Sequence, residues 1–244
     1  MTDVLLLHGQ PGTGGDWAGV AAELRERDGL TVRAPDRPGY GSSDLAAGGF
    51  DHNARAMAAL LDGPAVVAGH SWGAGVALAM ARRHPEKVRA LALVAPVTPE
   101  DQPGRIDAVL AGRRAGPLIA RASFLGAAAA LALPPLRRRI EPLVPGADPS
   151  RWPELTRSWR TFWVEQRALF DDLPDLRGSI DAPATVMVGT RDHVIDPAAA
   201  RRYASAIGAR LVDVADAGHL LPMQRPAEVA RAIAALTSSS RGDR

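Results

Sequence analysis

Cysteine is absent from this chain of 244 residues, and Lys87 is the only lysine among its 29 lysine and arginine residues. Without a thiol, the chain can form no disulfide, no thiolate metal site and no cysteine nucleophile. Aspartate and glutamate number 27, so the arginines leave a formal net charge of only +2. A charge so close to balance gives the chain little attraction for nucleic acid.

Long hydrophobic runs are also missing, and aromatic residues make up only 5% of the chain. The longest nearly uncharged run, residues 122–136, ends in Pro134-Pro135 and is too short and too broken to span a bilayer. Met1-Thr2-Asp3 lead directly into an apolar run, without the basic segment and cleavage site of a signal peptide. We therefore expect a cytoplasmic protein with no membrane partner.

The most informative stretch is the pentapeptide Gly69-His70-Ser71-Trp72-Gly73. An apolar run at residues 65–68 precedes it and a run of small residues at 74–80 follows it, which predicts a strand, a sharp turn and a helix. Glycine on both sides of the turn leaves room where a Cβ would collide with the crossing elements. Such a turn lifts Ser71 Oγ clear of the sheet and points the N–H of Trp72 at the same space. We therefore interpret Ser71 as a nucleophile, and not the Gly-x-Ser-x-Gly pattern as a chance occurrence.

Strand-like runs alternate with helical runs over most of the chain. Strands are expected at residues 4–7, 30–34, 65–68, 88–94, 184–188 and 211–214, and helices at 16–27, 50–61, 74–80 and 224–236. Continuous apolar runs are typical of parallel strands that are buried on both faces. The alternation favours right-handed crossovers. The predicted fold class is α/β, with a mostly parallel, doubly wound sheet of about six strands.

The alternation is interrupted between the fourth and fifth predicted strands. This segment is rich in proline and arginine, lacks a buried strand pattern and is far too long for a simple crossover. We expect a helical lid (cap) at residues 97–179, over the sheet edge where open α/β folds bind ligands. Residues 1–96 and 180–244 then form the core.

Two features of the predicted lid bear on function. Between residues 108 and 140 it has six arginines and no acidic residue, which favours a solvated helical face over an anion-binding patch. Trp159 and Trp163 lie one helical turn apart, with Phe162 and Phe170 nearby. This aromatic stripe must be buried, either in the core of the lid or as the lining of a substrate pocket.

A serine hydroxyl needs a base within hydrogen-bonding reach, and the base must be held by a third group. Of the six histidines, His219 follows the last predicted strand and so arrives at the same sheet edge as Ser71. Asp192 follows the preceding strand and is the predicted orienting acid. Asp196 is the alternative, but Pro197 directly after it is typical of a helix N-terminus that the aspartate caps.

These motifs together resemble the α/β-hydrolase fold superfamily, in its branch of lidded, cofactor-free esterases, lactonases and haloperoxidase-like enzymes. The resemblance covers residues 4–97 and roughly 182–236, and the chain order Ser, Asp, His is the order that this fold uses. The matching motifs are His8-Gly9-Gln10-Pro11-Gly12, Asp36-Arg37-Pro38-Gly39-Tyr40-Gly41-Ser42-Ser43, the pentapeptide at 69–73, Gly189-Thr190-Arg191-Asp192 and Gly218-His219. The resemblance implies that no cofactor or metal takes part. It also implies that the backbone N–H groups of Gln10 and Trp72 form an oxyanion hole.

The sequence departs from the family in one respect, since members usually have two further strands before the His-Gly loop. Those strands form the far edge of the sheet, so the site should survive, while the exposed edge needs other protection. Haloalkane dehalogenases and epoxide hydrolases of this fold use aspartate where Ser71 stands, so neither activity is expected.

The predicted function is cleavage of a small carboxylic ester or lactone through an acyl-enzyme on Ser71. In this mechanism His219 relays the proton and Asp192 holds the imidazole. Two alternatives stay open: an acyl-transferring or cyclising biosynthetic enzyme, and a non-catalytic ligand-binding member of the same fold. The expected partner is a small molecule and not nucleic acid, and the chain is expected to be a monomer or a homodimer.

Overall fold

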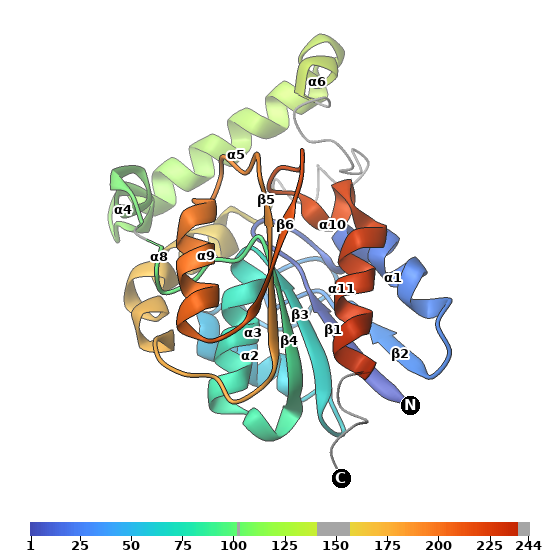
Figure 1. Cartoon of the computed structure of the whole chain (residues 1–244). Coiled ribbons are helices and arrows are strands. Elements are labelled where there is room, and N and C mark those ends of the chain that lie inside the picture. The colour runs from blue at the N-terminus through green and yellow to red at the C-terminus, as the bar shows by residue number, and fades with distance from the viewer. Residues whose placement is uncertain (102, 141–156, 239–244) are drawn as a thin grey trace.

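The computed structural model describes residues 1–101, 103–140 and 157–238, so the predicted lid lies partly outside the described residues. In the described part, one parallel sheet has the strand order β2-β1-β3-β4-β5-β6 (Figure 1). The strands are β1 (Thr2–Leu7), β2 (Leu30–Arg33), β3 (Ala65–His70), β4 (Val88–Val94), β5 (Ala184–Gly189) and β6 (Arg210–Val214). All five neighbouring pairs are parallel, which confirms the predicted fold class.

Helices cover both faces of the sheet and bury the apolar strands between two cores. On one face lie α2 (Phe50–Ala58), α3 (Trp72–Arg83) and α9 (Pro197–Ala206). On the other lie η1 (Gly14–Trp17), α1 (Ala18–Arg25), α10 (Leu221–Gln224) and α11 (Pro226–Ser238). The helix predicted at 16–27 is therefore a 3-10 turn followed by a shorter α-helix. The helix predicted at 224–236 is α11, with α10 as a separate turn before it.

The strand order reverses next to β1, because β2 lies on one side of β1 and β3 on the other. At such a switch point the loops after the two central strands separate and leave a crevice at the carboxyl edge of the sheet. The loop after β1 holds Gln10, and Ser71 follows β3 directly. The backbone N–H of Ser71 donates to the carbonyl of Val94 at 3.0 Å, which fixes the turn to the end of β4.

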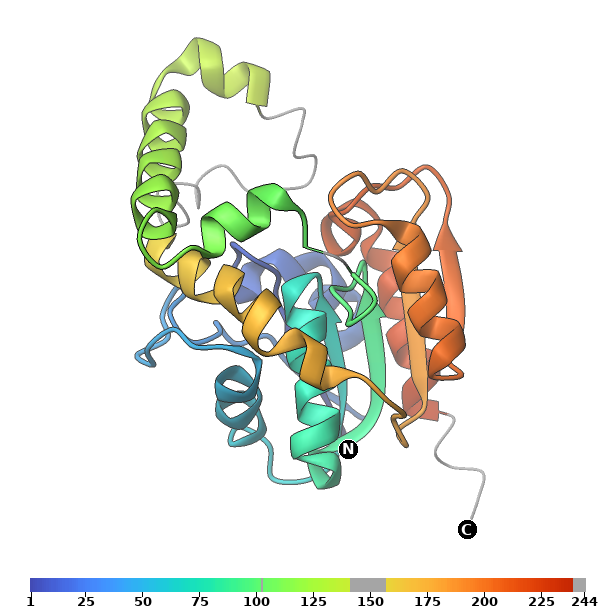
Figure 2. The same cartoon turned by 90° about the vertical axis from the view of Figure 1, so that its left-hand side faces the viewer.

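Among its described residues, the segment between β4 and β5 is mainly helical and has no strand. It contains α4 (Arg105–Ala111), α5 (Gly116–Ala132), α6 (Pro134–Ile140), α8 (Trp159–Asp171) and the 3-10 turn η5 (Leu173–Leu176). We call residues 97–179 the helical insertion. Figure 2 shows α8 lying across α3, whereas α5 and α6 extend away from the sheet. Phe124 of α5 packs against Phe162 of α8, with ring centroids 5.3 Å apart.

The β2 edge of the sheet is short and partly covered. The edge strand β2 is only four residues long, and the guanidinium of Arg25 donates to the carbonyl of Val32 at 3.5 Å. A short, partly covered edge offers few free backbone groups for pairing with another strand.

At the amino end of β4, Lys87 closes the turn η2 (Pro85–Lys87), and its Nζ donates to the carbonyl of Leu61 at 2.7 Å.

No single helix in the described ranges has both the length and the apolar character needed to cross a membrane. By length and composition alone, α4 and α5 would suffice only as a pair, and a bend of 104° separates them.

Candidate active site

Ser71 occupies the strained turn that the sequence predicts. Its φ of 53° and ψ of −122° are unusual for a residue with a side chain, and such strain is often found at functional sites. The flanking glycines are required by close approach. A Cβ on Gly69 would lie 2.3 Å from the carbonyl oxygen of Gly73, and a Cβ on Gly73 would lie 2.4 Å from that of His8.

The three side chains predicted for the triad form one continuous hydrogen-bonded chain. Ser71 Oγ lies 2.9 Å from His219 Nε2, and His219 Nδ1 lies 2.8 Å from Asp192 Oδ2. The second carboxylate oxygen of Asp192 accepts the backbone N–H groups of Val194 at 2.8 Å and Ile195 at 3.1 Å. The Asp192 side chain is 3% exposed and the His219 side chain 12%, so water has little access to the bond between them.

The charge of Asp192 determines which tautomer of His219 is present. Burial alone raises the pKa of the Asp192 carboxyl, but His219 and the N–H groups of Ile195 and Val194 outweigh it and lower the pKa. The carboxylate is therefore ionised at neutral pH and accepts the Nδ1–H of the imidazole. Nε2 then carries the lone pair and accepts the hydroxyl proton of Ser71.

Asp196, the alternative acid, has a different position. It is the N-cap of α9, where its Oδ1 accepts the N–H of Ala198 at 2.9 Å. Its other oxygen lies 3.8 Å from a guanidinium nitrogen of Arg202. Asp192 therefore contacts His219, whereas Asp196 caps the helix.

His70 has a supporting role that the sequence did not indicate. Its Nε2 lies 2.9 Å from the backbone carbonyl oxygen of His219. Burial, together with the repulsion that a protonated His219 would exert, lowers the pKa of His70 to about 3, so the ring is neutral and donates Nε2–H to that carbonyl. His70 thus holds the loop that carries the predicted base.

The sequence profile of the family described as "Alpha/beta hydrolase family" matches residues 4–232. The chain belongs to the α/β-hydrolase family. Two solved structures are similar over nearly its whole length. A thermophilic esterase from Thermogutta terrifontis is 25% identical, with a TM-score of 0.72, and the match covers 98% of this chain and 90% of that one. A structure described as a putative epoxide hydrolase from Pseudomonas aeruginosa is 22% identical, with a TM-score of 0.75. The match covers 98% of this chain and 89% of that one, and at this identity it shows the fold alone.

Curated relatives match this chain over a shorter stretch. It is 42% identical over 103 residues to "Lipase LipV" of Mycobacterium tuberculosis, covering 40% of this chain and 38% of the relative. It is 45% identical over 95 residues to a "Pimeloyl-[acyl-carrier protein] methyl ester esterase" of Chromobacterium violaceum, covering 38% of this chain and 36% of the relative. The chain therefore spans little more than a third of the length of these relatives.

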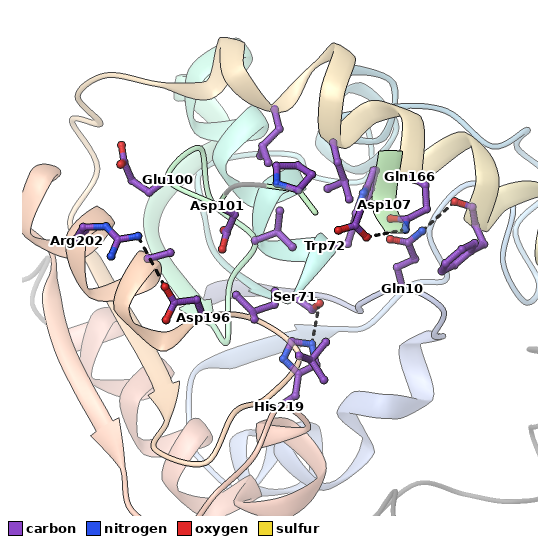
Figure 3. A pocket seen from close by; sticks show the side chains of 18 residues that line it. Gln10, Ser71, Trp72, Glu100, Asp101, Asp107, Gln166, Asp196, Arg202 and His219 are labelled. Carbon is purple, nitrogen blue, oxygen red and sulfur yellow. Dashed lines mark hydrogen bonds and ion pairs between the residues drawn. The ribbon is translucent and has the colours of Figure 1, made fainter. Parts of the chain in front are cut away.

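A cavity of about 530 Å³ opens beside Ser71 and His219 (Figure 3). Gln10 and Trp72, the predicted oxyanion-hole residues, both line it. The indole-bearing residue Trp72 is the first residue of α3, where a backbone N–H has no partner within the helix. The structure therefore brings both residues to the cavity that Ser71 also lines.

Of the two places predicted for Trp159 and Trp163, the pocket lining requires a correction, because neither residue lines the cavity. The residues of α8 that line the cavity are Phe162, Gln166 and Leu169. Position 163 is rotated by about 100° from 162, whereas 159 shares the face of 166 but lies about 10 Å away along the axis, at the first residue of α8. Trp163 instead points toward α4 and α5, where its Nε1 donates to the carbonyl of Gly112 at 3.4 Å.

Acidic side chains dominate the charge of the cavity. Among the described lining residues there are four carboxylates and one guanidinium, namely Glu100, Asp101, Asp107, Asp196 and Arg202. Burial is the main cause that raises the pKa of Asp101 to about 6. In the same described part of the chain, no group of three histidine, aspartate or glutamate side chains is placed to hold a metal ion.

Proposed function

We propose that this α/β hydrolase cleaves a carboxylic ester through an acyl-enzyme on Ser71. The observation that carries the proposal is the unbroken hydrogen-bonded chain from Ser71 through His219 to Asp192, which ends at the cavity. Ser71 Oγ attacks the ester carbonyl carbon while His219 Nε2 takes the hydroxyl proton. The ionised carboxylate of Asp192 stabilises the imidazolium that forms. The N–H groups of Gln10 and Trp72 receive the negative charge that develops on the carbonyl oxygen.

The second half of the reaction reverses these roles. His219 returns its proton to the leaving alkoxide, so the alcohol departs and the acyl group stays on Ser71. Water then attacks the acyl-enzyme, with His219 as base, and the carboxylic acid is released. A lactone would follow the same path, with the alcohol and the acid joined in one product.

Size and charge support small, uncharged or cationic esters and lactones as substrates. A cavity of about 530 Å³ suits a small molecule, since ligand pockets commonly measure ~300–1,000 Å³. Its four carboxylates repel an acyl group that ends in a free carboxylate. Ester chemistry also agrees with the two curated relatives, which are named as a lipase and a methyl ester esterase.

The helical insertion is proposed to act as a lid. Asp107 of α4 and Phe162, Gln166 and Leu169 of α8 line the cavity, so these helices close the side away from the sheet. Specificity for the acyl and alcohol groups would then depend on this segment.

Covalent labelling tests the proposed nucleophile. Phenylmethylsulfonyl fluoride should abolish turnover of p-nitrophenyl butyrate and add one sulfonyl group, which peptide mass mapping should find on Ser71. Ser71→Ala should lose turnover by at least 10³-fold, while Ser205→Ala, an exposed serine on α9, should behave as wild type. A label on another serine would refute the assignment. Acylation of Ser71 without turnover in plain buffer would instead indicate acyl transfer to another acceptor.

A further inference from the structure

A buried ion pair lies behind the loop that carries Gln10. Arg37 contacts Glu165 of α8 through a short hydrogen-bonded ion pair, and neither side chain is exposed to solvent. Removing two charges from water is costly unless further hydrogen bonds satisfy both groups. Here they do, because Arg37 also donates to Asn53 Oδ1 at 3.2 Å and Glu165 accepts the hydroxyl of Tyr40 at 2.7 Å.

The remaining N–H groups of Arg37 bind the backbone of the loop after β1. Nε donates to the carbonyl of His8 at 2.8 Å, and Nη2 donates to the carbonyl of Gly9 at 2.9 Å. The backbone N–H of Arg37 donates to His8 Nε2 at 2.9 Å, so the proton of this imidazole lies on Nδ1. That Nδ1 is 2.9 Å from the carbonyl oxygen of Gly9, which therefore accepts two hydrogen bonds.

The orientation of the Gly9 carbonyl sets the direction of the Gln10 N–H. Both groups belong to one peptide unit, and in a trans peptide they point in opposite directions. Because Arg37 holds the carbonyl of Gly9 on the side away from the cavity, the N–H of Gln10 is directed toward it. The side chain of Gln10 is fixed as well, since its Nε2 donates to the backbone carbonyl of Phe162 in α8 at 2.9 Å.

The same pair of residues also contacts Trp72, which carries the second proposed donor. The guanidinium carbon of Arg37 lies 4.6 Å from the centroid of the indole ring, within the range of a cation–π contact. The indole Nε1 donates to the backbone carbonyl of Glu165 at 3.3 Å. Phe50 also stacks on this ring system, with centroids 4.2 Å apart.

We propose that Arg37 and Glu165 are positioning residues that aim the N–H groups of Gln10 and Trp72 at the reacting oxygen. Helix α8 is then a structural part of the oxyanion hole and not only a wall of the cavity. This inference rests on the proposed function, because it assigns these N–H groups to the developing oxyanion. A purely structural pair would contribute to folding and leave the reaction rate unchanged.

Two variants separate positioning from stability. Glu165→Gln keeps the shape of the side chain but removes the charge that holds Arg37. Because a lone buried guanidinium is destabilising, the variant with both Arg37→Met and Glu165→Leu removes both charges and keeps the apolar volume. In this double variant the carbonyl of Gly9 loses its Arg37 donor. The matched control is Arg201→Met with Asp213→Leu, a pair bonded at 2.7 Å whose side chains are 39% and 45% exposed and lie on α9 and β6.

The first measurement is kinetic and uses p-nitrophenyl butyrate well below the melting temperature of each variant. Loss of one oxyanion donor costs roughly 10²–10³-fold in kcat, so a misdirected donor should cost on the order of 10–100-fold, with KM changed by less than threefold. Butylboronic acid forms a tetrahedral adduct on a nucleophilic serine, and its inhibition constant should rise by the factor by which kcat/KM falls. The control pair should leave both values unchanged.

The second measurement does not depend on activity. Hydrogen exchange, followed by mass spectrometry, should become faster at residues 8–12 in both test variants and stay unchanged in the control. Wild-type exchange at residues 8–12 in the double variant would overturn the inference whether or not the protein cleaves esters, and so would a wild-type kcat in that variant if it does. A different outcome is a wild-type protein that neither cleaves esters nor binds the boronate, while exchange at residues 8–12 is still faster in the test variants. That result would support the loop positioning and refute the proposed function.

Discussion

Replacing Asp192 by asparagine should remove activity by imposing the wrong tautomer on His219. The carboxylate oxygen that accepts the N–H groups of Val194 and Ile195 would be kept as the amide oxygen, because two donors face it at 2.8 and 3.1 Å. The amide NH₂ must then occupy the place of Oδ2 and donate toward His219 Nδ1. The imidazole responds by placing its proton on Nε2, which can no longer accept the hydroxyl proton of Ser71.

The size of this effect follows from the loss of the base. The corresponding aspartate-to-asparagine change in a serine protease lowers kcat by about 10⁴-fold, which corresponds to about 5.4 kcal/mol of transition-state stabilisation. Asp192→Asn should therefore fold normally and turn over p-nitrophenyl butyrate on the order of 10⁴-fold more slowly, with KM nearly unchanged.

Asp196 provides the matched control, because it lies close in sequence and caps α9 through a hydrogen bond to Ala198. Asp196→Ala should cost roughly 0.5–2 kcal/mol of stability through the lost cap. For a protein of this size that lowers Tm by about 1–8 °C, while kcat stays within a factor of three. The assays are kcat and a thermal melt for both variants. If Asp196→Ala loses turnover and Asp192→Asn keeps it, the reasoning from the hydrogen-bonded chain is wrong.

Two further predictions concern the cavity. Burial raises the pKa of Asp101 above its unfolded value, to about 6, so the folded state loses stability relative to the unfolded state as pH rises from about 4 to 6. Asp101→Asn should therefore raise Tm at pH 8 more than at pH 4, and an equal gain at both values would contradict a charged, buried Asp101. Phe162→Ala should shift the acyl preference toward longer p-nitrophenyl esters, whereas Trp163→Ala should lower Tm and leave the preference unchanged. Altered preference in Trp163→Ala alone would reverse our placement of the two side chains.

The elements that carry the site were predictable because local patterns specify them. The strand and turn around Ser71 have a sequence signature of glycines and apolar residues. Asp192 and His219 follow parallel strands, whose carboxyl ends meet at one sheet edge. In the structure these three side chains meet at that edge in one hydrogen-bonded chain. The motif that begins at Asp36 is also held locally, since the Asp36 carboxylate accepts the backbone N–H groups of Gly14 and Ser42 at 2.8 Å and so ties down the loop.

The pairing of Arg37 with Glu165 could not be predicted, because the partners lie 128 positions apart and the insertion has no recognisable pattern. One signal was present in α8, where Thr161, Glu165 and Ala168 share a helical face. An acidic residue on a face that is otherwise buried requires a partner, although its identity depends on the tertiary structure. The tryptophan stripe failed for a related reason, since helical periodicity shows that two residues share a face but not which neighbour that face meets.

The position of Lys87 has a practical consequence for work with this protein. It lies at the amino end of β4, and the parallel strands place Ser71 at the opposite, carboxyl end of the sheet. A strand of seven residues is about 23 Å long at ~3.3 Å per residue, so Lys87 and Ser71 are separated by roughly the length of this strand. An amine-reactive dye or resin that couples to the one lysine side chain of this chain would hold the molecule with its cavity facing the solution.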